Sequence, residues 1–199
     1  MNTLHLSQPT VSLLVPVNGQ KPLEGVLAIK FREKHGGRYG LPGERYDAVV
    51  GGIEYHARAC CEEELGFSAD SGSFEFFIFR DALDRDNRYP VTLEKVSHKR
   101  DLPAEFKDSS AVTTHHRPDM VFIYRHDGII VPEELKPEDG DEVSKVVALG
   151  FDEAEHAELA VSDDRALLMF YYDYLTGAIE LPANRILPST YWAIYRQAR

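Results

Sequence analysis

Apolar residues fall into short runs separated by glycine, proline and charged positions. Val11–Val17 and Gly25–Phe31 are rich in β-forming residues and predict two strands that form a hairpin or lie side by side. Phe74–Arg80 and Met120–Arg125 predict two more strands, and Lys145–Phe151 is a further apolar run. Because helical segments alternate with these strands, the pattern predicts a mixed fold of the α/β or α+β class.

One segment has clear helical spacing. No proline or glycine occurs from Ile53 to Leu65, and apolar residues recur at every fourth position at Ala57, Cys61 and Leu65. Gly66 follows where a C-terminal cap is expected. The sequence therefore predicts a helix over 53–65.

The second half of the chain predicts two further helices and one long connection. Ser162-Asp163-Asp164 has the composition of an N-cap and an acidic first turn, and a helix is expected after it. An aromatic tail at about 188–199 predicts a short helix that docks on the body. The polar segment at about 81–119 is long for a connection and predicts an insertion. No internal repeat or linker is evident, so we expect 1–199 to be a single domain.

Composition limits the class of protein. The chain has 199 residues, of which 43% are hydrophobic and 11% aromatic, enough to build a core. No apolar run approaches the length of a membrane span, and the first residues do not have the pattern of an export signal, so we expect a cytoplasmic protein without membrane contact. The only cysteines are the neighbours Cys60 and Cys61, which excludes a disulfide scaffold.

The charge balance limits the partners. With 33 acidic residues against 22 Lys and Arg, the net charge is −11, which disfavours binding to a nucleic acid polymer. A small phosphorylated ligand remains compatible, because a divalent cation can bridge carboxylates to phosphate oxygens. Many of the acids fall between Glu133 and Asp164, which predicts a solvated acidic face or a surface for a protein partner.

Three consecutive carboxylates, Glu62-Glu63-Glu64, precede Gly66 in the last turn of the predicted helix. The helix dipole disfavours each exposed acid there by roughly 0.3–1 kcal/mol, so local stability does not explain them. A divalent cation would turn the cluster into a ligand set. On an α-helix Cys60, Glu63 and Glu64 would share one face.

In this region the chain resembles the Nudix hydrolase family, whose box reads G-x5-E-x7-R-E-U-x-E-E-x-G-U, where U is a bulky apolar residue. Cys61–Phe67 matches the final U-x-E-E-x-G-U, and Tyr39–Gly43 is similar to the aromatic-x-Leu-Pro-Gly stretch before the box. The resemblance implies an α/β/α sandwich with a mixed β-sheet, in which a loop-helix-loop with its helix at about 53–65 binds Mg²⁺.

The box departs from the family pattern. Counting back from its final glycine, the Arg-Glu pair falls on Ala59-Cys60, and a register that places Arg58 on the arginine puts Ala59 on the glutamate. Glu44 occupies the position of the first box glycine, and the stretch up to the final glycine is one residue longer than the pattern. The middle glutamate falls at Gly51, or at Val50 if the extra residue lies later.

The resemblance also assigns roles to residues. It implies Mg²⁺ or Mn²⁺ as the cofactor, with Glu63, Glu64, Glu142 and the Gly43 carbonyl as metal ligands, and Glu63, Glu64 and Glu142 as the catalytic carboxylates. We expect Arg38, Tyr39, His115 and Arg117 to contact the substrate, although paired histidines such as His115-His116 are often simply exposed.

Three functions are consistent with these residues. The first is a Mg²⁺-dependent hydrolase of the diphosphate linkage in a nucleoside diphosphate joined to another group. The second is a Nudix-like protein that binds a nucleotide or acts as a regulator and has lost turnover with the box glutamate. The third is a protein-interaction scaffold. A small nucleotide-type ligand is the expected partner in the first two, and the aromatic tail is suited to a homodimer.

Overall fold

The structure is a computed structural model of the 199-residue chain. It describes residues 4–7, 9–32, 36–48, 50–83, 112–138, 140, 142–160, 162–188, 191 and 195, and the side chains of 4–7, 81–83, 112–117 and 162–163 are not described. Most of the predicted insertion at 81–119 and of the tail at 188–199 therefore lies outside the described residues. None of the helices within these ranges is long and apolar enough to cross a membrane.

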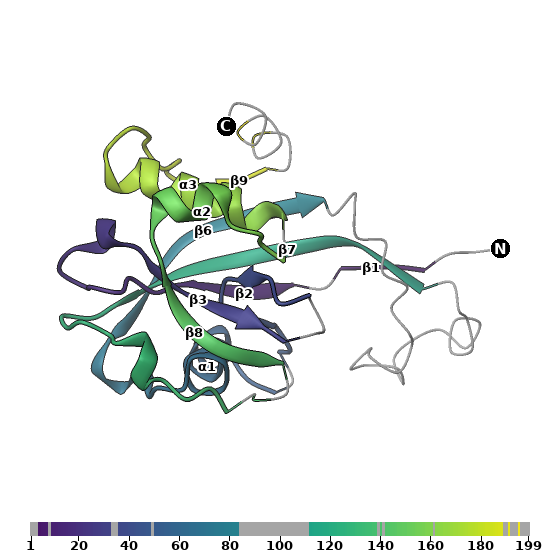
Figure 1. Cartoon of the computed structure of the whole chain (residues 1–199). Helices are drawn as coiled ribbons and strands as arrows, with labels where there is room; N and C mark the ends of the chain where they lie inside the picture. The colour runs from purple at the N-terminus through teal and green to yellow at the C-terminus, as the bar shows by residue number, and fades with distance from the viewer. Residues whose placement is uncertain are drawn as a thin grey trace.

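The strands form two sheets (Figure 1). The first has six strands, with the order β5-β2-β7-β6-β9 and β1 paired to β7, and mixes parallel with antiparallel neighbours. The second has three, in the antiparallel order β4-β3-β8. The strand bounds are β1 Leu4–Ser7, β2 Thr10–Leu14, β3 Val26–Phe31, β4 Tyr39–Gly40, β5 Gly43–Arg45, β6 Ser73–Leu83, β7 Val112–Arg125, β8 Val143–Leu149 and β9 Ile186–Leu187.

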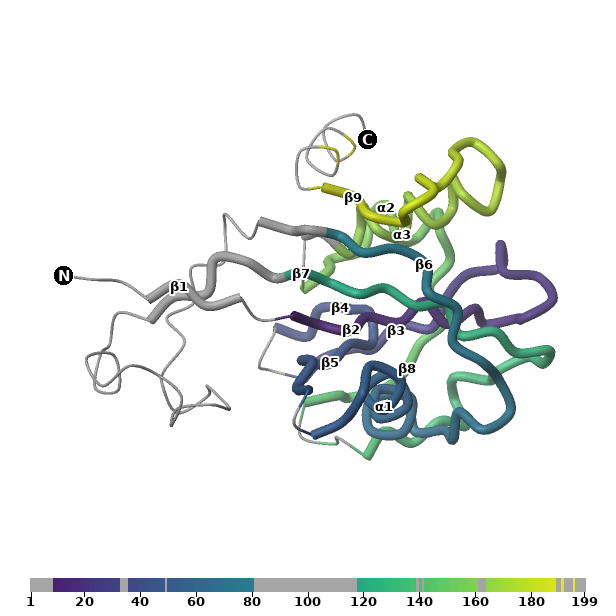
Figure 2. The backbone as a smooth tube through the Cα atoms, turned by 180° about the vertical axis from the view of Figure 1, so that it is seen from behind, coloured from purple at the N-terminus to yellow at the C-terminus, as the bar shows by residue number. Residues whose placement is uncertain are grey.

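Helices cover both sides of the strands. α1 (Ile53–Ala59) lies on one side, and α2 (Phe151–His156) and α3 (Ser162–Leu175) lie on the other, as both Figure 1 and the reverse view in Figure 2 show. The π-helical turn η3 (Cys60–Leu65) follows α1, and the 3-10 turns are η1 (Pro22–Glu24), η4 (Ala69–Ser71) and η8 (Pro132–Glu134). This arrangement confirms the predicted mixed α+β fold and its sandwich of layers.

The central strands bury both faces, which explains why their sequences read as continuous apolar runs. In β3, Val26 and Ala28 belong to the core under α2 and α3, whereas Leu27 and Ile29 belong to the core under α1. Successive side chains of a strand point to opposite faces, so one strand contributes to both cores. The molecule therefore has two hydrophobic layers, one on each side of the sheets.

The first two predicted strands are neighbours but do not form a regular hairpin. β2 belongs to the six-stranded sheet and β3 to the three-stranded sheet. The chain crosses from one sheet to the other near Val15, whose carbonyl accepts a hydrogen bond from Leu27 N at 2.7 Å. Pro16 and Val26 form an isolated antiparallel bridge. These two contacts join the six-stranded sheet to the three-stranded sheet. Of the two arrangements that the sequence predicted for these strands, the structure has neighbouring strands and not a hairpin.

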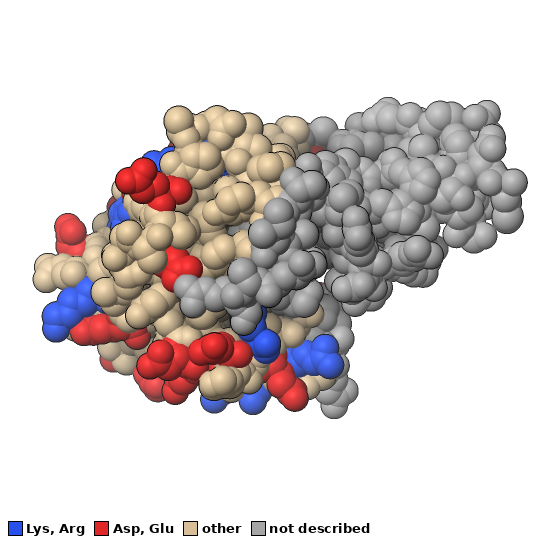
Figure 3. All heavy atoms as spheres, turned by 90° about the horizontal axis from the view of Figure 1, so that it is seen from above, with Lys and Arg blue, Asp and Glu red and all other residues tan. Residues whose placement is uncertain are grey.

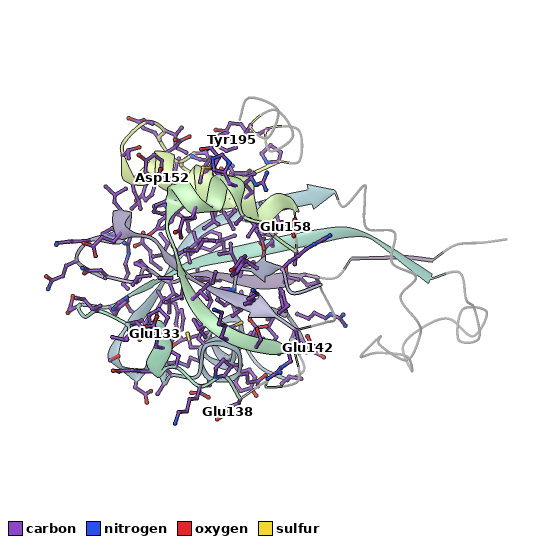
Figure 4. All side chains as sticks on the ribbon, in the orientation of Figure 1. Glu133, Glu138, Glu142, Asp152, Glu158 and Tyr195 are labelled. Carbon is purple, nitrogen blue, oxygen red and sulfur yellow. The ribbon has the colours of Figure 1, made fainter. Side chains whose placement is uncertain are left out.

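Tyr195, a described residue of the predicted aromatic tail, contacts α3. Tyr195 donates a hydrogen bond from its hydroxyl to Asp173 Oδ2 at 2.7 Å, and its ring meets Phe170 edge to face at 5.3 Å. Figure 4 shows Tyr195 above the helical layer. Tyr195 therefore packs on the body, and the predicted helix at 188–199 stays a prediction.

The acidic run between Glu133 and Asp164 does not form one face, contrary to the expectation from sequence. Glu133, Glu138 and Glu142 lie toward the α1 side, whereas Asp152 and Glu158 belong to the layer of α2 and α3 (Figure 4). On the face seen from above, acidic and basic groups are interspersed among other residues (Figure 3). The scaffold hypothesis loses one of its two expected surfaces, the continuous acidic face, and keeps the aromatic tail.

Candidate functional site

The predicted helix over 53–65 changes its winding partway. α1 ends at Ala59, and η3 continues from Cys60 to Leu65 as a π-helix. A π-helix closes its hydrogen bonds five residues apart, so it holds an additional residue within the same helical length. The single α-helical face expected for Cys60, Glu63 and Glu64 is therefore not formed as predicted.

The stretch from Glu44 to Gly66 is one residue longer than the family pattern. If the pattern is counted forward from Leu-Pro-Gly, this extra residue falls within the π-helical turn η3. In this count Arg58 occupies the arginine position and Ala59 the glutamate position, and Val50 replaces the middle glutamate. Cys60 then takes the apolar position, and because Cys60 is 1% and Cys61 0% exposed, the π-helical winding and not burial distinguishes this count from the backward one. The local structure favours this count over the backward count that placed Cys60 on the glutamate.

The end of the box helix contacts the Leu-Pro-Gly segment. The backbone N–H of Gly43, the first residue of β5, donates a hydrogen bond to Glu64 Oε2 at 2.7 Å. β5 pairs with β2 so that Gly43 lies opposite Ser12, and a Cβ on Gly43 would be 3.0 Å from the Val11 carbonyl oxygen. The structure thus brings together two of the predicted site residues, Glu64 and Gly43.

Glu44, the residue that replaces the first box glycine, contacts a buried histidine. Its Oε2 lies 3.1 Å from His56 Nδ1, and His56 Nε2 lies 3.0 Å from the Asp47 carbonyl oxygen. Burial alone would lower the pKa of His56, but the Asp47 carbonyl and the Glu44 carboxylate outweigh this effect and raise the pKa above its usual 6.5. This pair ties β5 to α1.

Sequence reasoning did not single out His56. Two features of the sequence could have identified His56. It lies four residues before Cys60 and so on the same side of the helix, and an acid, Glu44, replaces the first glycine of the box.

Cys60 is a buried, neutral thiol. Burial raises its pKa well above the usual value, and the nearby carboxylates Glu64 and Glu44 raise it further. A neutral thiol is a weak nucleophile and a poor partner for Mg²⁺, which prefers oxygen. Cys60 is therefore suited neither to bind Mg²⁺ nor to act as a nucleophile.

The donor set fits a divalent cation only in part. Among the side chains that the structure describes, no three His, Cys, Asp or Glu gather closely enough to hold a metal ion, so Glu142 does not complete such a group with Glu63 and Glu64. Glu63 is exposed and Glu64 is partly exposed. Mg²⁺ is commonly held by one or two carboxylates together with water and substrate phosphates. The pair Glu63 and Glu64 fits this second arrangement.

Glu142 lies immediately before β8. Its carbonyl oxygen accepts a hydrogen bond from Arg32 N at 2.8 Å, so its backbone is fixed beside the end of β3, and Figure 4 shows it at that end of β8.

The predicted substrate residues Arg38 and Tyr39 lie on and beside β4. Arg38, Glu158, Leu159 and Arg165 line a hollow of about 270 Å³. Tyr39 borders this region, because its backbone N–H donates to the Glu158 carbonyl oxygen at 2.9 Å. Arg165, which sequence reasoning did not identify, is oriented by a hydrogen bond of 2.8 Å from Nη2 to the Ala157 carbonyl oxygen. Two arginines and one acidic residue, Glu158, thus line one hollow.

His115 and Arg117 lie within β7, but their side chains are outside the described residues. Their predicted contact with substrate stays a prediction.

Comparisons with known proteins identify the fold. No protein-family model matches the chain, and no curated protein matches it. The NUDIX domain of Shewanella oneidensis NrtR, crystallised with ADP ribose, aligns over 88% of this chain and 90% of its own, with a TM-score of 0.52 and 13% identity. A MutT NUDIX hydrolase from Burkholderia pseudomallei aligns over 82% and 97%, with a TM-score of 0.50 and 17% identity.

A third solved structure, Shewanella oneidensis NrtR in complex with a 27mer DNA, aligns over 84% of this chain but only 62% of its own, with a TM-score of 0.51 and 16% identity. Together with the layers and the box helix, these similarities show that the chain has the Nudix fold. At such low identities the likeness concerns the fold alone.

Proposed function

We propose that this chain is a divalent-cation-dependent hydrolase that cleaves the diphosphate linkage of a nucleoside diphosphate joined to a second group. The observation that carries the proposal is the hydrogen bond of 2.7 Å between Gly43 N and Glu64 Oε2. This bond holds the acidic end of the box helix against the Leu-Pro-Gly segment, although the box lacks two of its glutamates and has one extra residue. The Nudix fold supports the same reaction class.

Glu63 and Glu64 would hold Mg²⁺ or Mn²⁺ together with water, substrate phosphates and the Gly43 carbonyl. Glu142, which the family resemblance offers as a further ligand, does not gather with Glu63 and Glu64 among the described side chains. The cation, when bound, neutralises charge on phosphate oxygens and activates water. Gly43 N fixes the orientation of the Glu64 carboxylate. Glu44 and His56 brace β5 against α1, so they keep the two sides of the site in register.

The hollow beside β4 is the proposed position for an anionic part of the substrate. Arg38 and Arg165 both line it, and guanidinium groups bind phosphate through paired hydrogen bonds. Arg38 and Gly43 are five positions apart in the chain, so their Cα atoms lie within roughly 18 Å of each other. That span suits a nucleoside diphosphate that carries a second group. Tyr39, His115 and Arg117 are proposed as further contacts.

A second function is favoured by the replaced box carboxylates. Ala59 and Val50 stand at the two glutamate positions in the forward count, and the described side chains form no three-ligand metal group. A protein that binds a nucleotide without turnover would keep the arginine-lined hollow and tolerate these losses.

Calorimetric titration with ADP-ribose, in the presence and absence of Mg²⁺, tests the ligand class. We expect binding that weakens at least tenfold in Arg38→Gln and Arg165→Gln. Lys21→Gln removes an exposed charge that pairs with Glu24, and it serves as the matched control that should bind normally. Equal binding by all variants would refute the proposed hollow. Binding without any metal-dependent product would favour the second function.

A further inference from the structure

A buried charge cluster, formed by Arg80, Asp119 and Asp164, lies between the six-stranded sheet and α3. Arg80 Nη2 is 2.7 Å from Asp119 Oδ2 and 3.5 Å from Asp164 Oδ1. The three side chains come from β6, β7 and α3, and each is more than nine-tenths buried. The sequence pattern had placed Asp164 in an exposed acidic first turn, and the structure corrects this by turning it inward toward Arg80.

The cluster is not explained by stability. It contains one cation and two carboxylates, and burial of a charge without full compensation is unfavourable. Burial raises the pKa of Asp164 from 3.8 to about 6, although Arg80 and the Leu41 amide act in the opposite direction. A neutral side chain at position 164 would avoid this cost, so the contacts of the carboxylate are the reason to examine for its presence.

Asp164 bonds to the backbone of the Leu-Pro-Gly segment, and Asp119 bonds to side chains of β2. Asp164 Oδ2 accepts a hydrogen bond from Leu41 N at 3.3 Å. Asp119 Oδ1 accepts hydrogen bonds from Thr10 Oγ1 at 3.0 Å and from Ser12 Oγ at 2.9 Å, both in β2. Ser12 is the residue that pairs with Gly43.

β2 also contacts this segment directly, because Leu13 N donates to the Pro42 carbonyl oxygen at 2.8 Å. The cluster thus reaches residues 41–43 by two routes: directly through Asp164, and through β2 by way of Asp119. Gly43 then presents its N–H to Glu64 at 2.7 Å.

We propose that the charge cluster positions residues 41–43 for Glu64, and that Asp164 is a positioning residue that regulates the candidate site through the Leu41 amide. The effect on turnover rests on the proposed hydrolase function. The positioning itself can be measured without turnover.

Amide hydrogen exchange of Leu41 and Gly43, followed by NMR at pH 7, tests the positioning. Asp164→Ala removes the acceptor and should speed exchange at Leu41 about tenfold, the effect of losing one hydrogen bond to a charged group. Asp164→Asn keeps a side-chain oxygen and should have a smaller effect. Asp173→Asn is the matched control, since Asp173 is also a buried carboxylate of α3 but bonds Tyr195, and it should leave Leu41 unchanged.

The wild-type protein provides a test that does not depend on any variant folding. Asp164 faces Arg80 from β6, Asp119 from β7 and the Leu41 amide. Lowering the pH from 7 to 5 should neutralise Asp164 and speed exchange at Leu41 relative to the intrinsic rate. The proposal would be overturned if Leu41 and Gly43 exchanged in Asp164→Ala at the same rates as in the wild-type protein. It would also be overturned if the exchange of Leu41 in the wild-type protein, relative to the intrinsic rate, did not change with pH. Equal acceleration of amides throughout the protein would overturn it as well.

Kinetics separate this inference from the proposed function. If the wild-type protein hydrolyses a substrate, Asp164→Asn should lower kcat several-fold with little change in KM, and Asp173→Asn should change neither. If the wild-type protein hydrolyses nothing, the proposed function fails, and the exchange experiment still decides whether Asp164 positions the segment. An unchanged kcat in a variant with altered exchange would remove the link to turnover.

Discussion

Asp164 makes a specific prediction about how the stability of the native protein depends on pH. Burial raises its pKa from 3.8 to about 6, so the folded protein binds this proton more tightly than the unfolded chain does. The free energy of unfolding that Asp164 contributes is therefore greatest below pH 4 and falls as the pH rises through about 6. A shift of this size corresponds to about 3 kcal/mol at 1.36 kcal/mol per unit.

Urea unfolding of the wild-type protein and of Asp164→Asn, at intervals from pH 3.5 to 7.5, measures this contribution. The free energy of unfolding of wild type minus that of the variant should decrease by about 3 kcal/mol across the range. Asp164→Ala is the control, because neither variant titrates at this position and the difference between the two variants should not depend on pH.

Two results would refute this reasoning. A difference that stays constant with pH would mean that Asp164 has the same pKa in the folded and unfolded states. A difference that increases with pH would mean that Arg80 and the Leu41 amide outweigh burial and lower the pKa, contrary to the burial of this carboxylate.

Three further predictions concern the packing around the site. Gly66→Ala should destabilise the protein by at least about 1–2 kcal/mol, because Gly66 has φ 76° and a Cβ there would be 2.3 Å from backbone atoms of Lys136; an unchanged Tm would contradict this. Arg80→Met should lower the free energy of unfolding by about 3–5 kcal/mol in urea titrations by leaving two buried carboxylates without their cation, and a loss below about 1 kcal/mol would show that the cluster is not buried as described. Cys60 and Cys61 should react with a thiol reagent at pH 8 only after unfolding, since burial raises the pKa of Cys61 to about 12 and that of Cys60 well above its usual value; rapid labelling of the native protein would contradict this.

The parts of the fold that depend on local pattern could be predicted from the sequence. β-Rich runs gave β2, β3, β6 and β7, and the four-residue apolar repeat gave the extent of the box helix. The two motif fragments assigned Glu64 and Gly43, 21 positions apart, to one site, and the structure joins them by a hydrogen bond from the Gly43 N–H that the motifs did not predict. Local propensity and tertiary packing agree in these elements.

Other features depend on packing that a one-dimensional pattern does not show. The change from α- to π-helical winding at Cys60 could be suspected only from the extra residue in the box, and its location required the structure. Asp164 had the features of a helix N-terminus, and its actual partner, Arg80, is 84 positions away in the chain. The acidic run was expected to form one face, but its residues lie on elements on opposite sides of the sheets.

The central claim, that the irregular box is a working hydrolase site, is tested most directly by measuring metal-dependent product release. The substrates are a panel of nucleoside triphosphates, dinucleotides and nucleotide sugars, assayed with Mg²⁺ or Mn²⁺. Glu64→Gln is compared with wild type, and Glu62→Gln is the matched control, because Glu62 is an exposed neighbour on the same turn. We predict that the wild-type protein and Glu62→Gln release product at similar rates. In Glu64→Gln the rate should fall by more than about 100-fold, which exceeds the loss typical of residues that only support metal ligands. No product from the wild-type protein, or equal rates in wild type and Glu64→Gln, would contradict the account.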